Sequence, residues 1–165
     1  MKSALLPEAA GKRNVLVDSN LLVLLIVGSV NPRRIAQFKR TSKYTAPDYF
    51  LLADVINEFA AIYTVAHVMS EVSNLADLDA KERQTAREIL KQLIHHVTEP
   101  ELRSSVASEH RFYPHLGLTD AAIASVAQEH DCLVLTDDLP LYLRLYASNV
   151  SAINYTYLRV RFGIV

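Results

Sequence analysis

The chain has 165 residues, half of them hydrophobic, which excludes a disordered protein and favours one domain with a substantial core. A formal net charge of −1 excludes a globally cationic nucleic-acid binder, so any nucleic-acid contact must come from a local patch or from phosphates bridged by metal ions. Cys132 is the only cysteine, which excludes an internal disulfide and fits a reducing compartment.

The N-terminal residues contain Pro7 and Gly11 and make a poor signal peptide. We therefore expect a flexible lead-in over residues 1–13 and one domain over residues 14–165. The longest apolar run, Leu21–Val27, is about a third of the roughly 20 residues that a membrane-spanning helix needs. The sequence thus predicts a soluble, cytoplasmic protein that does not enter a membrane.

Strands and helices are predicted to alternate along the chain. A continuous apolar run predicts a buried strand over Asn14–Asp18, and an apolar helix follows from Asn20. The later predicted elements are helices from Pro32 to about Lys39, Pro47 to about Tyr63, His67 to Leu78, Asp79 (with Glu82 as a capping box) to about His96, and Thr119 onwards, then a strand over Cys132–Thr136, a helix through Tyr146 and a strand near Ser151–Tyr157. This order predicts an α/β fold in which helices flank a central parallel sheet, an α/β/α sandwich.

Acidic residues end two of the predicted strands. Asp18 closes the first strand, and Asp137 and Asp138 follow the strand Cys132–Thr136. Sites in parallel sheets gather at the carboxyl ends of the strands, so these acids are expected at one edge of the sheet. The alternative is that each aspartate simply caps the helix that follows it.

Glu71 stands on the apolar face of its predicted helix, between Val68 and Leu75. A carboxylate in such a stripe is costly unless it is paired or bound to a metal, and an ion pair is the alternative to a metal. Asp54 and Glu58, by contrast, share a polar face and are expected to be ordinary solvated acids.

Asp120 repeats this pattern, with Ile123 and Ala127 following it on the same face. The alternative is a first-turn aspartate that the helix dipole stabilises. Carboxylates gathered in one cleft repel one another, by about 4 kcal/mol for a pair roughly 4 Å apart at an effective dielectric of about 20. A divalent cation cancels that repulsion. Oxygen-only ligands favour Mg²⁺ or Mn²⁺, and the six histidines show no zinc-ligand spacing.

Four segments occur in a characteristic order: VLVDSN at the first strand, SEVSNL on a middle helix, LTDAAIASVAQEH on a later helix and VLTDD on the strand after it. This set resembles the PIN-domain family of nucleases, over about Asn14–Tyr157. The most specific pair is the Asp-led helix and the strand that ends in Thr-x-Asp. The resemblance implies a PIN-like nuclease domain that hydrolyses phosphodiester bonds, usually of RNA, with a divalent metal.

The resemblance also implies a role for each matching residue. The metal-binding and catalytic acids that it implies are Asp18, Glu71, Asp120 and Asp138. The supporting residues that it implies are Ser19, Thr136, Asn74 and Asp137. Glu71 would orient a water molecule or act as general base. The segment Val30–Tyr63 is longer than in small family members, which include toxins of toxin–antitoxin pairs, so toxin status and RNA target stay open.

A basic segment without acids lies between Asn31 and Pro47. The predicted substrate-binding residues in it are Arg33, Arg34, Lys39, Arg40 and Lys43. With Phe38 and Tyr44 interleaved, the segment suits single-stranded RNA, which is bound by charge and stacking, and a solvated helix face is the alternative. Alternation over Tyr155–Arg161 favours an edge strand or a subunit contact over RNA binding.

Two rival functions are weighed against the nuclease. A PIN-like protein-interaction module with weak or no nuclease activity has no reason to tolerate four mutually repelling acids. A phosphatase or receiver domain would need a second acid close to Asp18, where Ser19 and Asn20 stand instead. The expected partner is therefore an RNA substrate. An antitoxin protein stays an open question, and the apolar composition favours a homodimer.

Overall fold

The computed structural model describes residues 6–164, in which four parallel strands form one central sheet. The sheet order is β2-β1-β3-β4, and the strands are β1 Asn14–Val17, β2 Ala61–Tyr63, β3 Cys132–Thr136 and β4 Ala152–Asn154. All of β3 and most of β1 are buried, as continuous apolar runs predict for central strands, whereas the two edge strands are shorter and partly exposed. The predicted parallel α/β sheet is confirmed.

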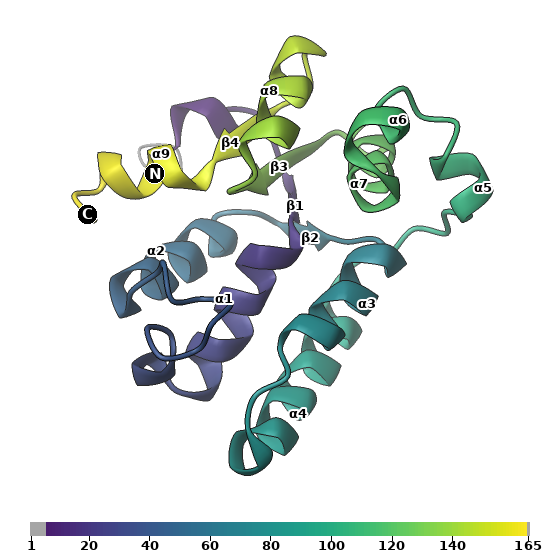
Figure 1. Ribbon diagram of the computed structural model, residues 1–165. Helices are drawn as coiled ribbons and strands as arrows, with labels where there is room; N and C mark the ends of the chain where they lie inside the picture. The colour runs from purple at the N-terminus through teal and green to yellow at the C-terminus, as the bar shows by residue number, and fades with distance from the viewer. Residues whose placement is uncertain (1–5, 165) are drawn as a thin grey trace.

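Helices enclose the sheet, with α1 to α4 together on one side and α8 and α9 on the other in the view of Figure 1. The α-helices are α1 Ser19–Val30, α2 Ala46–Asn57, α3 Ala66–Leu75, α4 Ala80–His96, α5 Ser104–Ala107, α6 Tyr113–Leu116, α7 Leu118–Glu129, α8 Leu139–Ala147 and α9 Tyr155–Arg161. Helix α1 is apolar all round because it packs against α2, α3 and α4. Gly28 lets α2 approach closely, since a Cβ there would meet the ring of Tyr49 at 2.2 Å.

The helix predicted from Pro32 to Lys39 is wrong. Only Pro32–Arg34 form a 3-10 turn, η2, and turns continue from there to the start of α2. Burial of Ile35 fixes this path, and the hydroxyl of Thr41 donates to the carbonyl of Ile35 at 2.7 Å. Such side-chain bonds to the backbone compete with a regular helix.

The predicted helix over Pro47–Tyr63 is too long, because α2 ends at Asn57 and Ala61–Tyr63 form β2. Strand β2 pairs with β1 in the register Val15↔Ile62. A β-branched residue beside an aromatic favours a strand, but three residues are too few to show its two-residue period against a preceding helix.

The predicted strand over Ser151–Tyr157 is half right, because β4 ends at Asn154 and α9 begins at Tyr155. The Asn154 side chain accepts the backbone N–H of Thr156 at 2.9 Å and so caps the helix. The alternation of Tyr155, Tyr157, Arg159 and Arg161 is therefore not a strand face. Tyr155 is buried and Tyr157 is exposed.

Two predicted helix caps also differ from the structure. Thr119 lies inside α7, whose cap is Gly117 with φ +87°, a left-handed conformation that favours glycine. Asp79 is the N-cap residue of α4, as predicted, but its side chain makes no capping bond. Asp79 and Glu82 both pair with Arg34 instead, at 2.9 and 2.7 Å.

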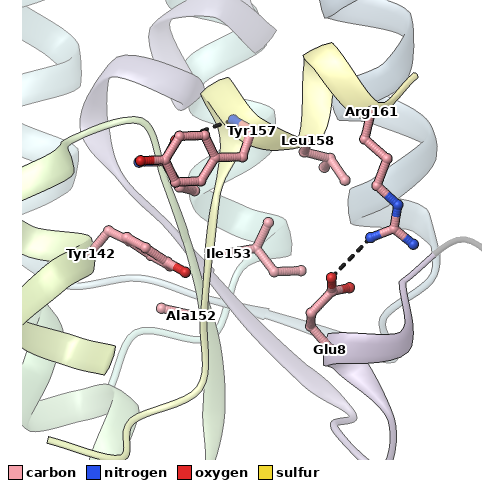
Figure 2. Close-up of a pocket in the computed structure, with 8 residues that line it drawn as sticks. Glu8, Tyr142, Ala152, Ile153, Tyr157, Leu158 and Arg161 are labelled. Carbon is pink, nitrogen blue, oxygen red and sulfur yellow. Dashed lines mark hydrogen bonds and ion pairs between the residues drawn. The ribbon is translucent and has the colours of Figure 1, made fainter. Parts of the chain in front are cut away.

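Part of the predicted flexible lead-in is described, and it packs on the domain. Residues 1–5 lie outside the described residues, but Leu6 is buried and Pro7–Ala9 form the 3-10 helix η1. Figure 2 shows Glu8 reaching across to Arg161 of α9, and this ion pair is 2.9 Å long. Within residues 6–164, no helix has the length and apolar character that crossing a membrane requires.

Candidate active site

The strand register brings the two acidic strand ends together. Val17 of β1 pairs with Leu135 of β3, so Asp18 and Thr136 follow at the same edge of the sheet. Both aspartates do cap helices: Oδ1 of Asp18 accepts the N–H of Leu21 at 3.1 Å, and Oδ1 of Asp138 that of Leu141 at 2.9 Å. The capping alternative is thus true, but each cap occupies only one oxygen of its carboxylate.

The four predicted acids line one pocket of about 270 Å³. The acids in its lining are Asp18, Glu71, Asp120 and Asp138. They come from four different places in the fold: the ends of β1 and β3, the middle of α3 and the first turn of α7. Ser19 and Thr119 add hydroxyl groups to the same lining. The structure therefore brings the four predicted acids into the lining of one pocket.

Glu71 is half-buried beside Val68 and Val72, as its place in the apolar stripe predicts. Ser19 donates its hydroxyl to Oε2 of Glu71 at 2.8 Å, which ties α3 to the start of α1. Among residues 6–164, no lysine or arginine forms an ion pair with Glu71, so the ion-pair alternative does not apply. Asn74 is exposed, and the bond that orients Glu71 comes from Ser19.

Asp18 is the most deeply buried acid of the pocket, with 5% of its surface exposed. Its Oδ2 accepts the hydroxyl of Thr136 and, at 3.2 Å, the backbone N–H of Asp137. Burial, followed by the charge of Asp137, raises the pKa of Asp18 to about 7, although these hydrogen bonds act in the opposite direction. A carboxylate held in this way favours a proton or a metal cation as its neutralising partner.

Asp120 shows that the other acids lie within electrostatic reach of one another. Burial raises the pKa of Asp120 to about 6, and the charges of Asp138 and Glu71 contribute in the same direction. Desolvation and mutual repulsion together are the condition under which a divalent cation binds most favourably.

Asp137 lies beside the pocket but outside its lining. Its side chain is 1% exposed and turns toward the basic segment, where Oδ2 accepts the hydroxyl of Tyr44 and pairs with Lys43. Sequence reasoning missed Tyr44 in this role, because a tyrosine among cations suggested a stacking surface. In the structure Tyr44 is buried, with 2% exposed. Its sole local signal is its position just before the capping box of α2.

The basic segment divides into paired and exposed cations. Arg34 is held by Asp79, Glu82 and Gln37 and so supports the fold at η2. Arg33, Lys39, Arg40 and Lys43 are exposed. Of these four, Lys43 forms an ion pair with Asp137, the residue next to the pocket.

The donor set suits a hard cation. Among the described residues, no three acidic, histidine or cysteine side chains converge into a ready-made metal site. Asp18, Glu71 and Asp138 accept hydrogen bonds from hydroxyls or a backbone amide. The pocket nevertheless offers oxygen ligands alone and space for an ion that keeps several waters. Mg²⁺ binds in this way through one or two carboxylates. The residues present therefore fit Mg²⁺ or Mn²⁺ in their chemistry.

Comparison with known protein families gives a match to one family model. The family model of the PIN domain matches residues 15–142, which is more than half of the chain and includes all four pocket acids. No curated protein sequence matches the chain.

Proposed function

The chain belongs to the PIN-domain family, whose members are usually nucleases, and from this we propose that it is a metal-dependent endoribonuclease. The proposed substrate is RNA, and the proposed cofactor is Mg²⁺ or Mn²⁺. The observation that carries the proposal is that four carboxylates from four separate elements line one pocket and that, among the described residues, none of the four forms an ion pair. A structural role would not require that arrangement.

Asp18, Asp120 and Asp138 are the proposed metal ligands. Bound there, a divalent cation would neutralise charge on the phosphate and lower the pKa of water. The protein supplies the positions: Thr136 and the Asp137 amide hold Asp18, and the cap bond to Leu141 holds Asp138. The side chains are thus oriented before a ligand arrives, which reduces the cost of reorganisation.

Glu71 is the proposed general base. Ser19 bonds to Oε2, which orients the carboxylate and leaves Oε1 to accept a proton from the attacking water. The phosphodiester bond would then break as the oxygen of that water bonds to phosphorus, and the leaving sugar oxygen would take up a proton from solvent water. Ser19→Ala should therefore lower the cleavage rate by about tenfold through Glu71, with Mn²⁺ affinity nearly unchanged.

The deciding experiment is cleavage of labelled single-stranded RNA in Mn²⁺, Mg²⁺ or EDTA, with wild type and Asp18→Asn compared. We expect metal-dependent cleavage that EDTA abolishes and that falls at least about a hundredfold in the variant. Asp54→Asn is the matched control, because it makes the same chemical change on the exposed face of α2. Equal loss in both variants, or cleavage that persists in EDTA, would contradict the proposal.

A PIN-like interaction module remains the second candidate, because Asp18, Glu71 and Asp138 accept hydrogen bonds from hydroxyls or backbone amides without a metal. It predicts no cleavage of any RNA and no Mn²⁺ binding by calorimetry. The nuclease proposal instead predicts Mn²⁺ binding even when the RNA in the assay is not a substrate of this protein. A toxin-type nuclease would in addition slow growth when it is expressed alone and would be neutralised by a co-expressed antitoxin partner.

A further inference from the structure

One residue contacts both the acid pocket and the basic segment. The backbone N–H of Asp137 donates to Asp18, while its carboxylate accepts the hydroxyl of Tyr44 and pairs with Lys43. The carboxylate is 1% exposed, and its Oδ1 is buried and has no hydrogen-bond partner among residues 6–164. Burial of a carboxylate is unfavourable unless it is paired, so we take its contacts with Tyr44 and Lys43 as the role of this side chain.

We propose that Asp137 is a positioning residue that fixes Lys43 at the edge of the acid pocket, and that it is not a metal ligand. Lys43 would then contact the RNA phosphate next to the cleaved bond, a step that rests on the proposed ribonuclease function. The Lys43 side chain is 59% exposed, and an ammonium group has three donors. With one donor directed at Asp137, two are available for phosphate oxygens.

A second set of contacts comes from α9 and holds the turn over residues 41–44, which we call the corner. Arg159 donates to the carbonyl of Lys43 at 3.2 Å, and its guanidinium lies 5.8 Å from the ring centroid of Tyr44. The ring of Tyr155 meets that of Tyr44 edge-on at 6.2 Å between centroids. Helix α9 therefore holds the backbone of the corner, and Asp137 holds the side chains of Lys43 and Tyr44.

The contacts also separate Asp137 from its neighbour Asp138. Asp138 lines the pocket and caps α8. The carboxylate of Asp137 lies outside the pocket lining and accepts the Tyr44 hydroxyl and the Lys43 ammonium group. Both of these contacts hold Oδ2 of Asp137. The two adjacent aspartates thus have different roles, because Asp138 lines the pocket and Asp137 holds Tyr44 and Lys43.

The test compares Asp137→Asn, Tyr44→Phe and Asp138→Asn by hydrogen exchange and by Mn²⁺ titration, neither of which needs nuclease activity. The amides to follow are those of Thr41 and Tyr44, which bond to Phe38 and Thr41 within the corner. We expect Asp137→Asn and Tyr44→Phe to accelerate their exchange by about tenfold, with Mn²⁺ affinity within about threefold of wild type. Asp138→Asn should instead weaken Mn²⁺ by about tenfold or more and leave the exchange unchanged.

Asp77→Asn is the matched control, because it makes the same chemical change in the exposed ion pair between Asp77, which lies between α3 and α4, and Arg83 of α4. It should change neither readout. The proposal is overturned if Asp137→Asn weakens Mn²⁺ as much as Asp138→Asn does, or if corner exchange is unchanged in both Asp137→Asn and Tyr44→Phe. Failure of the nuclease proposal would appear separately, as absent RNA cleavage with these exchange results intact.

Discussion

Asp48 and Asp18 are both almost completely buried, and their surroundings differ. Asp48 at the start of α2 is 0% exposed and accepts Thr45 and Arg159, with Nη2 of Arg159 2.9 Å from Oδ2 and its Nε 2.8 Å from Oδ1. Asp18 at the end of β1 is 5% exposed, and the charge that acts on it is that of another acid, Asp137. One buried acid has its cation within the fold, and the other does not.

The difference separates structure from proposed function. Asp48 joins α2 to α9, because its cation comes from a distant part of the chain and the pair is complete without a ligand. Asp18 is held by hydrogen-bond donors, but no cation among the described residues pairs with it. Its neutralisation must therefore come from a proton or from a bound ion. Burial of an acid is therefore informative only together with the sign of its neighbours.

The largest expected effect comes from breaking the paired region. Arg159→Met removes the cation and leaves Asp48 buried without it, which should lower the free energy of unfolding by about 3–5 kcal/mol. Urea unfolding followed by circular dichroism measures the change. Arg83→Met is the control, because its ion pair with Asp77 is solvent-exposed and should be worth less than about 1 kcal/mol. Equal losses in the two variants would remove the distinction between the regions.

The unpaired region predicts a pH dependence of the metal-free protein. The pKa of Asp18 is raised from 3.8 to about 7, and that of Asp120 from 3.8 to about 6. At a pH between the ordinary and the raised pKa of either group, the folded state therefore binds more protons than the unfolded state. Stability contributed by these groups is therefore greatest at acidic pH and falls as pH rises from about 4 to about 7, by up to about 1.4 kcal/mol per pH unit for each group.

The measurement is the free energy of unfolding against pH, in EDTA and in saturating Mn²⁺. Asp18→Asn should flatten the fall in EDTA, because the variant has no proton to lose at this position. Mn²⁺ should stabilise the wild type more at pH 7.5 than at pH 5, since the metal competes with protons for the same carboxylates. A wild type and variant with parallel pH profiles would show that Asp18 is not the titrating group.

The acid pocket was predictable from the sequence because its members occupy positions with a local signature. Asp18 directly follows an apolar run, Asp138 stands just after the strand that ends in Thr136, and Glu71 interrupts an apolar stripe. Strand ends and helix faces are properties of a few neighbouring residues. The parallel register, which the alternation of elements implies, then brings those positions together.

The paired region was not predictable in the same way. Asp48 and Arg159 are 111 residues apart, and Asp48 alone looks like an acid in a first helical turn. The stretch before Arg159 also alternates like a strand, which hid the helix that turns Arg159 toward α2. Asn154 was the available signal, since asparagine is a preferred N-cap residue. The Asp137–Tyr44 contact, 93 residues apart, escaped for the same reason.

The smallest expected effects come from applying the same comparison to cations. Arg34 is paired with Asp79 and Glu82, whereas Arg33, Lys39 and Arg40 are exposed and, among the described residues, form no ion pair. Replacing those three with alanine should weaken binding of single-stranded RNA and reduce the slope of log affinity against log salt by about 2, because each phosphate contact adds about 0.7. Arg34→Ala should leave the slope unchanged, and fluorescence anisotropy across a salt series measures both. If Arg34→Ala reduces the slope as much as a single change among the three, pairing within the fold does not decide which cations bind RNA.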